Sequence, residues 1–478
     1  MILSALIGFP LVAAVLVAVF GRSRPSTARS VALAASVAEL ALAAVATWEL
    51  VSRGGLALVE TAGAGSLWNL SMDGLAAPLV VLTAVLTVIA VLASWRVTRA
   101  PAAMMALLLC LEAAVVGVFL AANVFVFYAA WEAVLVPMFF LIGVWGHEDR
   151  QHAAMKFFLY TFAGSALMLL GLIIAVLGAH GTSFAVLIAN TPASLQPIVF
   201  WLLLAGFLVK IPAWPLHTWL PDAHVEAPTA GSIMLAGVLL KMGGYGLLRL
   251  ALPVAPATFH QWAWLLATIG AIGIVYGALM ALAQSDLKRL VAYSSVSHMG
   301  FVLVAVATGT ALGAGAALLV MVSHGLVSAL LFLLVGTMYD RTHTRTIADL
   351  GGLGRAVPVW SVAFVFAALA SLGLPGLSGF PGELLTVLTS WGPFATVAAA
   401  AALGALLAAG YNLWAVSRVS YGTARDRWSG LADLALHEGV AVGTLAIGIV
   451  VLGIAPGLVL TVAEPFTRAL GALLGGTP

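Results

Sequence analysis

Long apolar blocks run through the whole chain and are separated by short polar or Pro/Gly-rich breaks. Blocks of about 18 to 25 residues are long enough to cross a hydrocarbon layer of about 30 Å as helices. Lipid offers the backbone no hydrogen-bonding partners, so only helices or closed barrels can cross it, and a barrel would show short alternating segments. Lys and Arg number 20 and Asp and Glu 18 among 478 residues, which is about a third of the charge content of a soluble chain. We therefore expect an all-α polytopic membrane protein.

Cutting the chain at these breaks predicts about fourteen transmembrane helices in a single membrane domain. They cover residues 2–21, 30–51, 75–95, 104–121, 123–145, 154–178, 195–215, 229–251, 260–283, 290–307, 312–337, 358–390, 393–417 and 437–460. The first block has no basic start, so we expect it to be retained rather than cleaved as a signal peptide.

Basic residues favour the loops that follow odd-numbered helices, and the opposite loops hold only Arg53, Arg249 and Arg468. Because basic loops stay in the cytoplasm, both termini are predicted on the outer, periplasmic side of a bacterial inner (plasma) membrane. The net charge of +2 gives no reason to expect a nucleic-acid partner. The single cysteine, Cys110, cannot form an internal disulfide or an iron–sulfur cluster by itself, so we expect no redox centre in this chain.

Four ionisable residues lie near the centres of predicted helices: Glu132, Lys241, His298 and His324. A charge at this depth costs about 2.5–3.5 kcal/mol on insertion scales, so each is a candidate functional residue. The alternative is a packing contact satisfied between helices, which is about as plausible for the two histidines because histidine can hydrogen-bond across helices.

Two further charged residues adjoin expected helix breaks. Lys210 is followed by Pro212 and Pro215, and Glu383 follows a run rich in Gly and Pro at 373–382. Proline removes a backbone donor and clashes one turn back, so both helices are expected to break beside the charged residue. Two broken helices that each carry an ion-handling side chain indicate an internally repeated transporter.

These landmarks divide the chain into four parts. We expect an N-terminal three-helix segment at 1–103, a first five-helix repeat at 104–251, a second repeat at 252–417, and a last loop, helix and tail at 418–478. An odd number of crossings per repeat makes the second copy inverted. By position, Lys210 then corresponds to Glu383, and Glu132 to His298.

A row of acids and bases at mid-membrane can transfer protons. Burial disfavours the charged form of both a lysine and a carboxyl group, and bringing the two together reverses both effects. We therefore hypothesise that Glu132 modulates Lys210, that Lys241 and His298 or His324 pass a proton on, and that Glu383 delivers it towards the exit. Water must fill the gaps between these side chains.

Other polar residues are weaker candidates. His217 and His224 lie seven residues apart with Pro221 between them, which fits no usual zinc pattern, so we expect no metal and favour a gate or proton uptake on the cytoplasmic side. Glu39 and Glu112 also fall within helices, but no break or basic partner accompanies them. Packing or local pairing is the favoured interpretation for both.

Six segments together resemble a known family. They are WEAVLVPMFFLIGVWG (131–146), VKIPAWPLHTWLPDAHVEAPTAGSIMLAGVLLKMGGYGLLR (209–249), SDLKRLVAYSSVSHMGFV (285–302), SHGLVSALLF (323–332), RTHTRTIADLGGL (341–353) and GLPGLSGFPGE (373–383). As a set they look like the chain M or chain 4 family of NADH-quinone oxidoreductase, the antiporter-like membrane subunits of respiratory complex I, over about residues 70–460.

This resemblance implies a fourteen-helix subunit with two inverted five-helix repeats, broken seventh and twelfth helices, and proton translocation through Glu132, Lys210, Lys241 and Glu383. It implies partners in the membrane arm, including two other antiporter-like chains. It also implies that NADH, FMN, iron–sulfur clusters and quinone are bound by partner subunits and that this chain holds no cofactor. The rival interpretation is a subunit of a multisubunit Na+/H+ antiporter or a membrane-bound hydrogenase, to which the family is related, and a passive scaffold is a third.

Overall fold

The computed structural model describes residues 1–21, 24–61, 63, 67–423 and 425–475. Twelve of its helices are long and apolar enough to cross a membrane, and two shorter apolar helices, Gln196–Lys210 and Pro358–Ser371, lie where the seventh and twelfth crossings are expected. The helical, polytopic fold is therefore confirmed. Arg22, one of the basic residues in the first predicted cytoplasmic loop, lies outside the described residues.

The elements follow one another in a simple order. The first half of the chain contains α1 (Ile2–Phe20), α2 (Pro25–Ser52), β1 (Leu58–Thr61), β2 (Asn69–Met72), α3 (Ala76–Ala93), α4 (Pro101–Leu120), α5 (Val124–Ala133), α6 (Leu135–Trp145), α7 (Arg150–Ala179), α8 (Phe184–Asn190), α9 (Gln196–Lys210), α10 (Trp219–Glu226), α11 (Thr229–Met234), η1 (Leu235–Leu239), α12 (Leu240–Gly246), η2 (Leu247–Ala251) and α13 (Leu252–Val254). The second half contains α14 (Pro256–Leu282), α15 (Leu287–Ala307), α16 (Ala311–Thr342), η3 (Ile347–Asp349), α17 (Leu353–Ala356), α18 (Pro358–Ser371), α19 (Gly379–Trp391), α20 (Ala395–Val419), η4 (Asp426–Trp428), α21 (Leu436–Ile454) and α22 (Gly457–Leu473).

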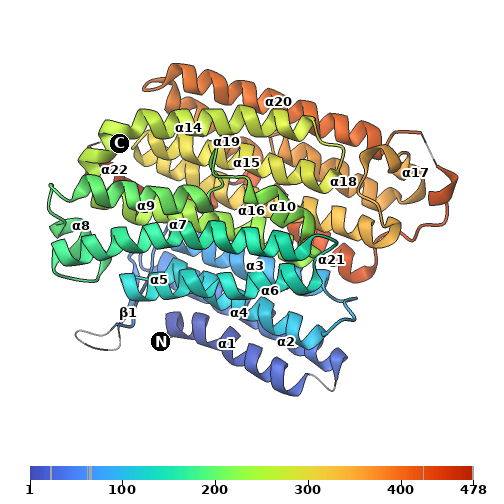
Figure 1. Cartoon of the computed structure of the whole chain (residues 1–478), viewed down its shortest axis with the longest axis horizontal. Coiled ribbons are helices and arrows are strands. Elements are labelled where there is room, and N and C mark those ends of the chain that lie inside the picture. The colour runs from blue at the N-terminus through green and yellow to red at the C-terminus, as the bar shows by residue number, and fades with distance from the viewer. Residues whose placement is uncertain (22–23, 62, 64–66, 424, 476–478) are drawn as a thin grey trace.

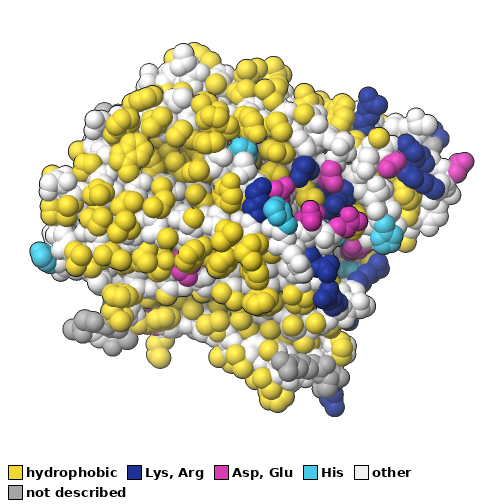
Figure 2. All heavy atoms as spheres, in the orientation of Figure 1, with side chains coloured by type: hydrophobic (Ala, Val, Ile, Leu, Met, Phe, Trp, Pro, Cys, Tyr) yellow, Lys and Arg dark blue, Asp and Glu magenta, His cyan; other side chains and the backbone are white. Residues whose placement is uncertain are grey.

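The long helices run side by side along one direction, with α1 and α2 at one edge of the bundle and α20 at the other (Figure 1). Both termini lie at the end that also holds β1, α8 and α22 (Figure 1). On the face shown in Figure 2, Lys, Arg, Asp and Glu gather at the opposite end, and hydrophobic side chains cover most of the rest. This arrangement agrees with a membrane-crossing bundle whose basic loops share one side.

The centre of the bundle is formed by α15, α16 and the run from α11 to α13, which are almost entirely buried. Helices that are apolar all round are typical of such positions. Small residues bring them close: the carbonyl oxygen of Gly270 on α14 would lie 2.6 Å from a Cβ added to Gly300 on α15. Close backbone approach at small residues is a common way to pack helices in lipid.

Both predicted helix breaks are present. α9 ends at Lys210, and after a non-helical stretch α10 begins at Trp219, whose indole nitrogen donates to the carbonyl of Val209 at 3.1 Å. Likewise α18 ends at Ser371 and α19 begins at Gly379, with Gly373 at φ 77° and Gly376 at φ 92° between them. These left-handed conformations cost glycine little, so Glu383 follows the break by about one helical turn.

Some elements were not predicted from the sequence. β1 and β2 pair antiparallel, with Leu58 opposite Met72. The crossing that holds Lys241 contains two wide π-helical turns, η1 and η2, on either side of α12. After α21, α22 continues the chain where the sequence analysis placed no helix beyond residue 460.

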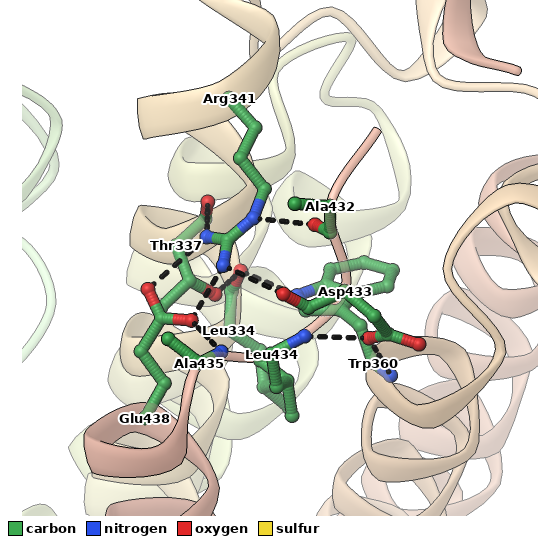
Figure 3. A network of polar contacts seen from close by, with 9 residues as sticks. All are labelled: Leu334, Thr337, Arg341, Trp360, Ala432, Asp433, Leu434, Ala435 and Glu438. Atoms are coloured by element: carbon green, nitrogen blue, oxygen red, sulfur yellow. Dashed lines mark hydrogen bonds and ion pairs between the residues drawn. The ribbon is translucent and has the colours of Figure 1, made fainter. Parts of the chain in front are cut away.

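Loops at the basic end are tied to the bundle by a buried ion pair. Arg341 near the end of α16 and Glu438 at the start of α21 lie 2.5 Å apart (Nη2 to Oε2), and the guanidinium also donates to the carbonyls of Ala432 and Asp433 (Figure 3). The carboxylate of Asp433 accepts the backbone N–H of Trp360 at 3.0 Å. The segment before α21 is thereby fixed to both α16 and α18.

Candidate functional site

Four of the candidate residues lie in one row inside the bundle. The Nζ atom of Lys241 lies 2.7 Å from Nδ1 of His324 on α16, and the His324 and His298 rings lie 5.7 Å apart between centroids. Nδ1 of His298 on α15 lies 2.9 Å from Oε1 of Glu383 on α19. All four side chains are buried. The structure therefore brings Lys241, His324, His298 and Glu383, which the sequence places on four different crossings, into one connected row.

A small cavity joins the two histidines. It has a volume of about 20 Å³ and is lined in part by His298, Ser323, His324, Ser371 and Glu383. A site of about 10–15 Å³ is enough for one water molecule if polar partners surround it. Nε2 of His324 has no hydrogen-bonding partner among the described residues. One water in this cavity would therefore have both a vacant ring nitrogen and hydroxyl groups to bind.

Three polar side chains that the sequence analysis did not select complete this row. The hydroxyl oxygens of Ser371 and Tyr411 lie 3.4 Å and 3.3 Å from Nε2 of His298. The side-chain amide of Asn412 donates to the hydroxyl oxygen of Ser371 at 3.2 Å. Tyr411 and Asn412 are adjacent polar residues that follow a long apolar run in α20. That interruption is the signal by which they could have been found.

Lys210 lies apart from this row, at the last residue of α9. Its side chain is 1% exposed, and its Nζ atom has no hydrogen-bonding partner in the described part of the chain. Aromatic faces surround it instead: Nζ lies 5.6 Å from the ring centre of Trp131 and 5.8 Å from that of Phe157. A cation is favoured at a helix C-terminus and over aromatic rings, but neither interaction replaces a full set of acceptors.

Glu132, the residue after Trp131 on α5, is half-buried, and its Oε1 atom has no hydrogen-bonding partner among the residues described. Its charge acts on Lys210, and it also interacts with Tyr128 one turn earlier. The structure shows no direct ion pair between Glu132 and Lys210. The acid and the base are neighbours that do not touch.

His217 and His224 occupy different surroundings. His224 on α10 is fully buried and stacks on Phe332 at 4.5 Å, and neither of its ring nitrogens has a partner in the described structure. The charges of both Lys288 and Lys241 act on it. His217 packs edge-on against Tyr276 at 5.0 Å. His224 thus belongs to the bundle centre, whereas His217 lies in the break between α9 and α10.

A polar cavity of about 490 Å³ opens at the basic end of the bundle, lined in part by Arg96, His147, Thr229 and Asp340. Burial, together with the charges of Lys288 and Arg345, lowers the pKa of His147 to about 3. This loop histidine is therefore neutral at physiological pH and serves as a polar wall rather than a cation.

Comparison with known proteins identifies the family of the chain. A family model described as NADH:quinone oxidoreductase/Mrp antiporter, TM, matches residues 121–408. The chain belongs to this family. The matched region includes Glu132, Lys210, Lys241, His298, His324 and Glu383.

Two curated members are similar over nearly the whole chain. NADH-quinone oxidoreductase subunit M of Rhodobacter capsulatus is 40% identical over 97% of this chain and 95% of its own length. NAD(P)H-quinone oxidoreductase chain 4 1 of Synechococcus sp. is 43% identical over 99% of this chain and 93% of its own. The recognition made from the sequence segments is therefore confirmed.

Solved structures extend the comparison. A chain of respiratory complex I from Thermus thermophilus matches with a TM-score of 0.91 and 31% identity over the full length of both chains. A chain of an archaeal membrane-bound sulfane sulfur reductase (TM-score 0.91, 21% identity) and one of the Mrp complex from Dietzia sp. (TM-score 0.84, 22% identity) match over at least 99% of each chain. At these lower identities the last two show a shared fold alone.

Proposed function

We propose that this chain is a proton-translocating membrane-arm subunit of NADH:quinone oxidoreductase. Its family, and its identity of about 40% to subunits of that name over nearly the whole chain, support this role. The row of buried acids and bases from Lys241 to Glu383 is the observation that carries the proposal, because such side chains in a membrane mark ion routes.

Protons pass along the row by successive hydrogen bonds. Lys241 gives a proton to Nδ1 of His324 when that nitrogen carries a lone pair, and Nε2 of the same ring releases one to a water in the cavity. The water protonates His298, which is in hydrogen-bonding contact with the carboxylate of Glu383. Each step moves one proton between an existing donor and an acceptor, so the row needs no other reactant.

Lys210 and Glu132 act as the switch of the first half. Burial without acceptors makes the ammonium form of Lys210 costly, and the nearby Glu132 charge stabilises it. Movement of the carboxylate towards or away from Lys210 then decides whether the lysine holds its proton. We assign proton uptake at the basic end to His217 and His224; a polar cavity opens at the same end, although neither histidine lines it.

The two halves form inverted five-helix repeats at 104–251 and 252–417, and the basic end faces the cytoplasm. The position of both termini at the opposite end agrees with this orientation (Figure 1). Cysteine placed at position 426, on a background that lacks Cys110, should be labelled only from the cytoplasmic side.

The other membrane-arm subunits, including two further antiporter-like chains, are the partners. NADH, FMN, iron–sulfur clusters and quinone are bound by partner subunits.

The central experiment is Glu383→Gln in the assembled complex, reconstituted into vesicles. Loss of the carboxylate should reduce NADH-driven dye-quench proton uptake by about ten-fold or more, because a positioned acid–base group typically contributes at least that much. Glu464→Gln, in an exposed pair with Arg468, is the matched control and should pump normally. Full pumping by assembled Glu383→Gln would refute the proposal.

A Na+/H+ antiporter subunit or a membrane-bound hydrogenase is the alternative, and the similarity to the Mrp complex supports it at the level of the fold. Dependence of activity on sodium, without co-purifying NADH-oxidising subunits, would favour it.

A further inference from the structure

Two buried acids lie outside the proposed proton route. Glu39 is on α2 and Glu112 on α4, and their side chains are 1% and 0% exposed. α2 and α4 pack against each other and both pack against α3, and the charge of Glu39 acts on Glu112. The sequence analysis expected only packing or local pairing at these positions. The structure places the two acids on helices that pack against each other.

No described residue donates a hydrogen bond to the carboxyl oxygens of Glu39 or Glu112. All four carboxyl oxygens are buried and lack a partner among the described residues. Thr87 on α3 interacts with Glu112, but its hydroxyl donates to the carbonyl of Thr83 at 3.0 Å. The hydroxyl of Ser36, one turn before Glu39, likewise donates to the carbonyl of Leu33. The hydroxyls nearby therefore do not satisfy the carboxyl oxygens.

Among the described residues, no cation is hydrogen-bonded or ion-paired to Glu39 or Glu112. Within their residue ranges, α1, α3 and α6 carry no charged side chain, α5 carries Glu132 with Tyr128, and α4 adds only Cys110. On α2, Arg29 is more than two turns from Glu39 and donates to the carbonyl of Val97, and Glu49 pairs with Arg53. α12 also packs against α4 and carries Lys241 and Tyr245, but Lys241 bonds to His324 and the carbonyl of Ala236, and the Tyr245 hydroxyl donates to the carbonyl of Phe119. None of these groups is hydrogen-bonded to Glu39 or Glu112.

Two ionised carboxylates cannot share such a site, because burial and mutual repulsion both oppose ionisation. Leaving each buried acceptor unpaired costs about 1–3 kcal/mol. A bound proton removes a charge and at the same time supplies the missing donor, since a protonated carboxyl group can donate to its neighbour. We propose that Glu39 and Glu112 form a proton-binding site in the N-terminal helices, in which a protonated carboxyl group hydrogen-bonds to the other.

This site does not include any residue of the route through Lys241 and Glu383, and the proposal does not depend on the pumping mechanism. A proton entering it bonds to a carboxylate oxygen, and a proton leaving it passes to water. The pair is therefore a reversible proton store between α2 and α4.

The test is modification of the native complex by the apolar reagent dicyclohexylcarbodiimide, which reacts with protonated carboxyl groups, followed by peptide mass spectrometry. At about pH 8, where solvated carboxyls are ionised, Glu112 or Glu39 should be labelled several-fold more than the exposed Glu464. In Glu39→Gln, labelling of Glu112 should fall several-fold, because the like charge that favours its proton is gone.

Absence of labelling at both positions in the wild-type complex would overturn the proposal, and this measurement needs no variant to fold. Unchanged labelling of Glu112 in Glu39→Gln would show two independent acids rather than a shared site. If excess sodium chloride, but not choline chloride, protected Glu39 and Glu112 from labelling, the site would bind a cation and not a proton, which would overturn the proposal.

Discussion

The two halves of the proposed route differ in how their charged groups are connected. In the second half of the route, which starts at Lys241 near the end of the first repeat, Lys241, His324, His298 and Glu383 touch directly or across a cavity of about 20 Å³. In the first half, Lys210 has aromatic rings around it and no hydrogen-bonding partner among the described residues, and Glu132 stays out of contact. One structure therefore contains a joined and a separated acid–base set. The joined half can conduct, whereas the separated half can regulate, because a small movement of Glu132 changes the charge balance at Lys210.

Lys210→Ala should have the largest effect, because it removes the base of the separated half. We expect proton uptake by the assembled complex to fall by at least about ten-fold, with NADH oxidation also reduced. Dye-quench uptake in vesicles measures the change, and native gels check assembly. Arg468→Ala, at an exposed pair, is the control. Full proton pumping by assembled Lys210→Ala would refute the proposed role of Lys210 as a proton switch.

Glu132→Gln should come next, because it removes the charge that acts on Lys210 without changing the size of the side chain. Pumping should again be strongly reduced. Glu132→Asp keeps the charge but shortens its reach, so it should recover part of the activity if distance matters. Equal activity of the Gln and Asp variants would show that the carboxylate does not act on Lys210.

His324→Ala breaks the joined half. Lys241 would then keep only the carbonyl of Ala236 as its partner, and the water cavity would lose one polar wall. We expect pumping to fall several-fold. His324→Gln retains a polar group that can accept from Lys241, so it should be less impaired. Wild-type pumping by both His324 variants would show that the contact between Lys241 and His324 does not conduct protons.

Tyr411→Phe should have a smaller effect, about two- to three-fold, because the hydroxyl is one of two that approach His298 at more than 3 Å. The pH dependence of NADH oxidation separates orientation of His298 from a structural role. A changed profile with unchanged thermal stability supports orientation, and the reverse contradicts it.

Asp73→Asn should change stability rather than pumping. Burial raises the pKa of Asp73, but the Arg249 charge and its hydrogen bonds outweigh this and lower the pKa below the usual value. The pair therefore stabilises the fold at neutral pH, and this stability is lost as pH falls through the lowered pKa. The side chains of Arg249 and Asp73 are 17% and 15% exposed. We therefore expect Asp73→Asn to lower the free energy of unfolding by about 2–3 kcal/mol, less than for a fully buried pair. Heat-induced loss of the subunit, followed on native gels at pH 7 and at acidic pH, measures it.

The helical bundle and its two breaks were predictable because their causes are local. Pro212 removes a backbone donor two residues after Lys210, and Gly373 and Gly376 before Glu383 adopt positive φ. Depth in an apolar block was enough to select Lys241 and His324. Their contact was not predictable, because it joins α12 to α16 across more than 80 residues of chain. The sequence analysis considered either His298 or His324 as the next carrier, and the structure places both in the row.

Other features had weak or no local signals. Tyr411 and Asn412 are only two polar residues in a largely apolar helix. Many surface helices carry as many polar residues, so the signal is weak. The lack of a basic hydrogen-bonding partner for Glu39 and Glu112 in the described structure depends on which helices pack together. The wide turn η1 contains no proline or charged residue that could mark it, and Pro253, two residues after η2, predicts a helix break as readily as a wide turn.

The wide turn η1 gives Lys241 a special freedom. Such a turn holds one residue more than an α-helical turn, and Lys241 reaches back across it to the carbonyl of Ala236. If the extra residue shifted past Lys241, the side chain would rotate by about 100° around the helix axis. The ammonium group would swing away from His324 while the helix stayed folded and its ends stayed in place. A crossing packed too tightly to slide could in this way still open and close a proton contact.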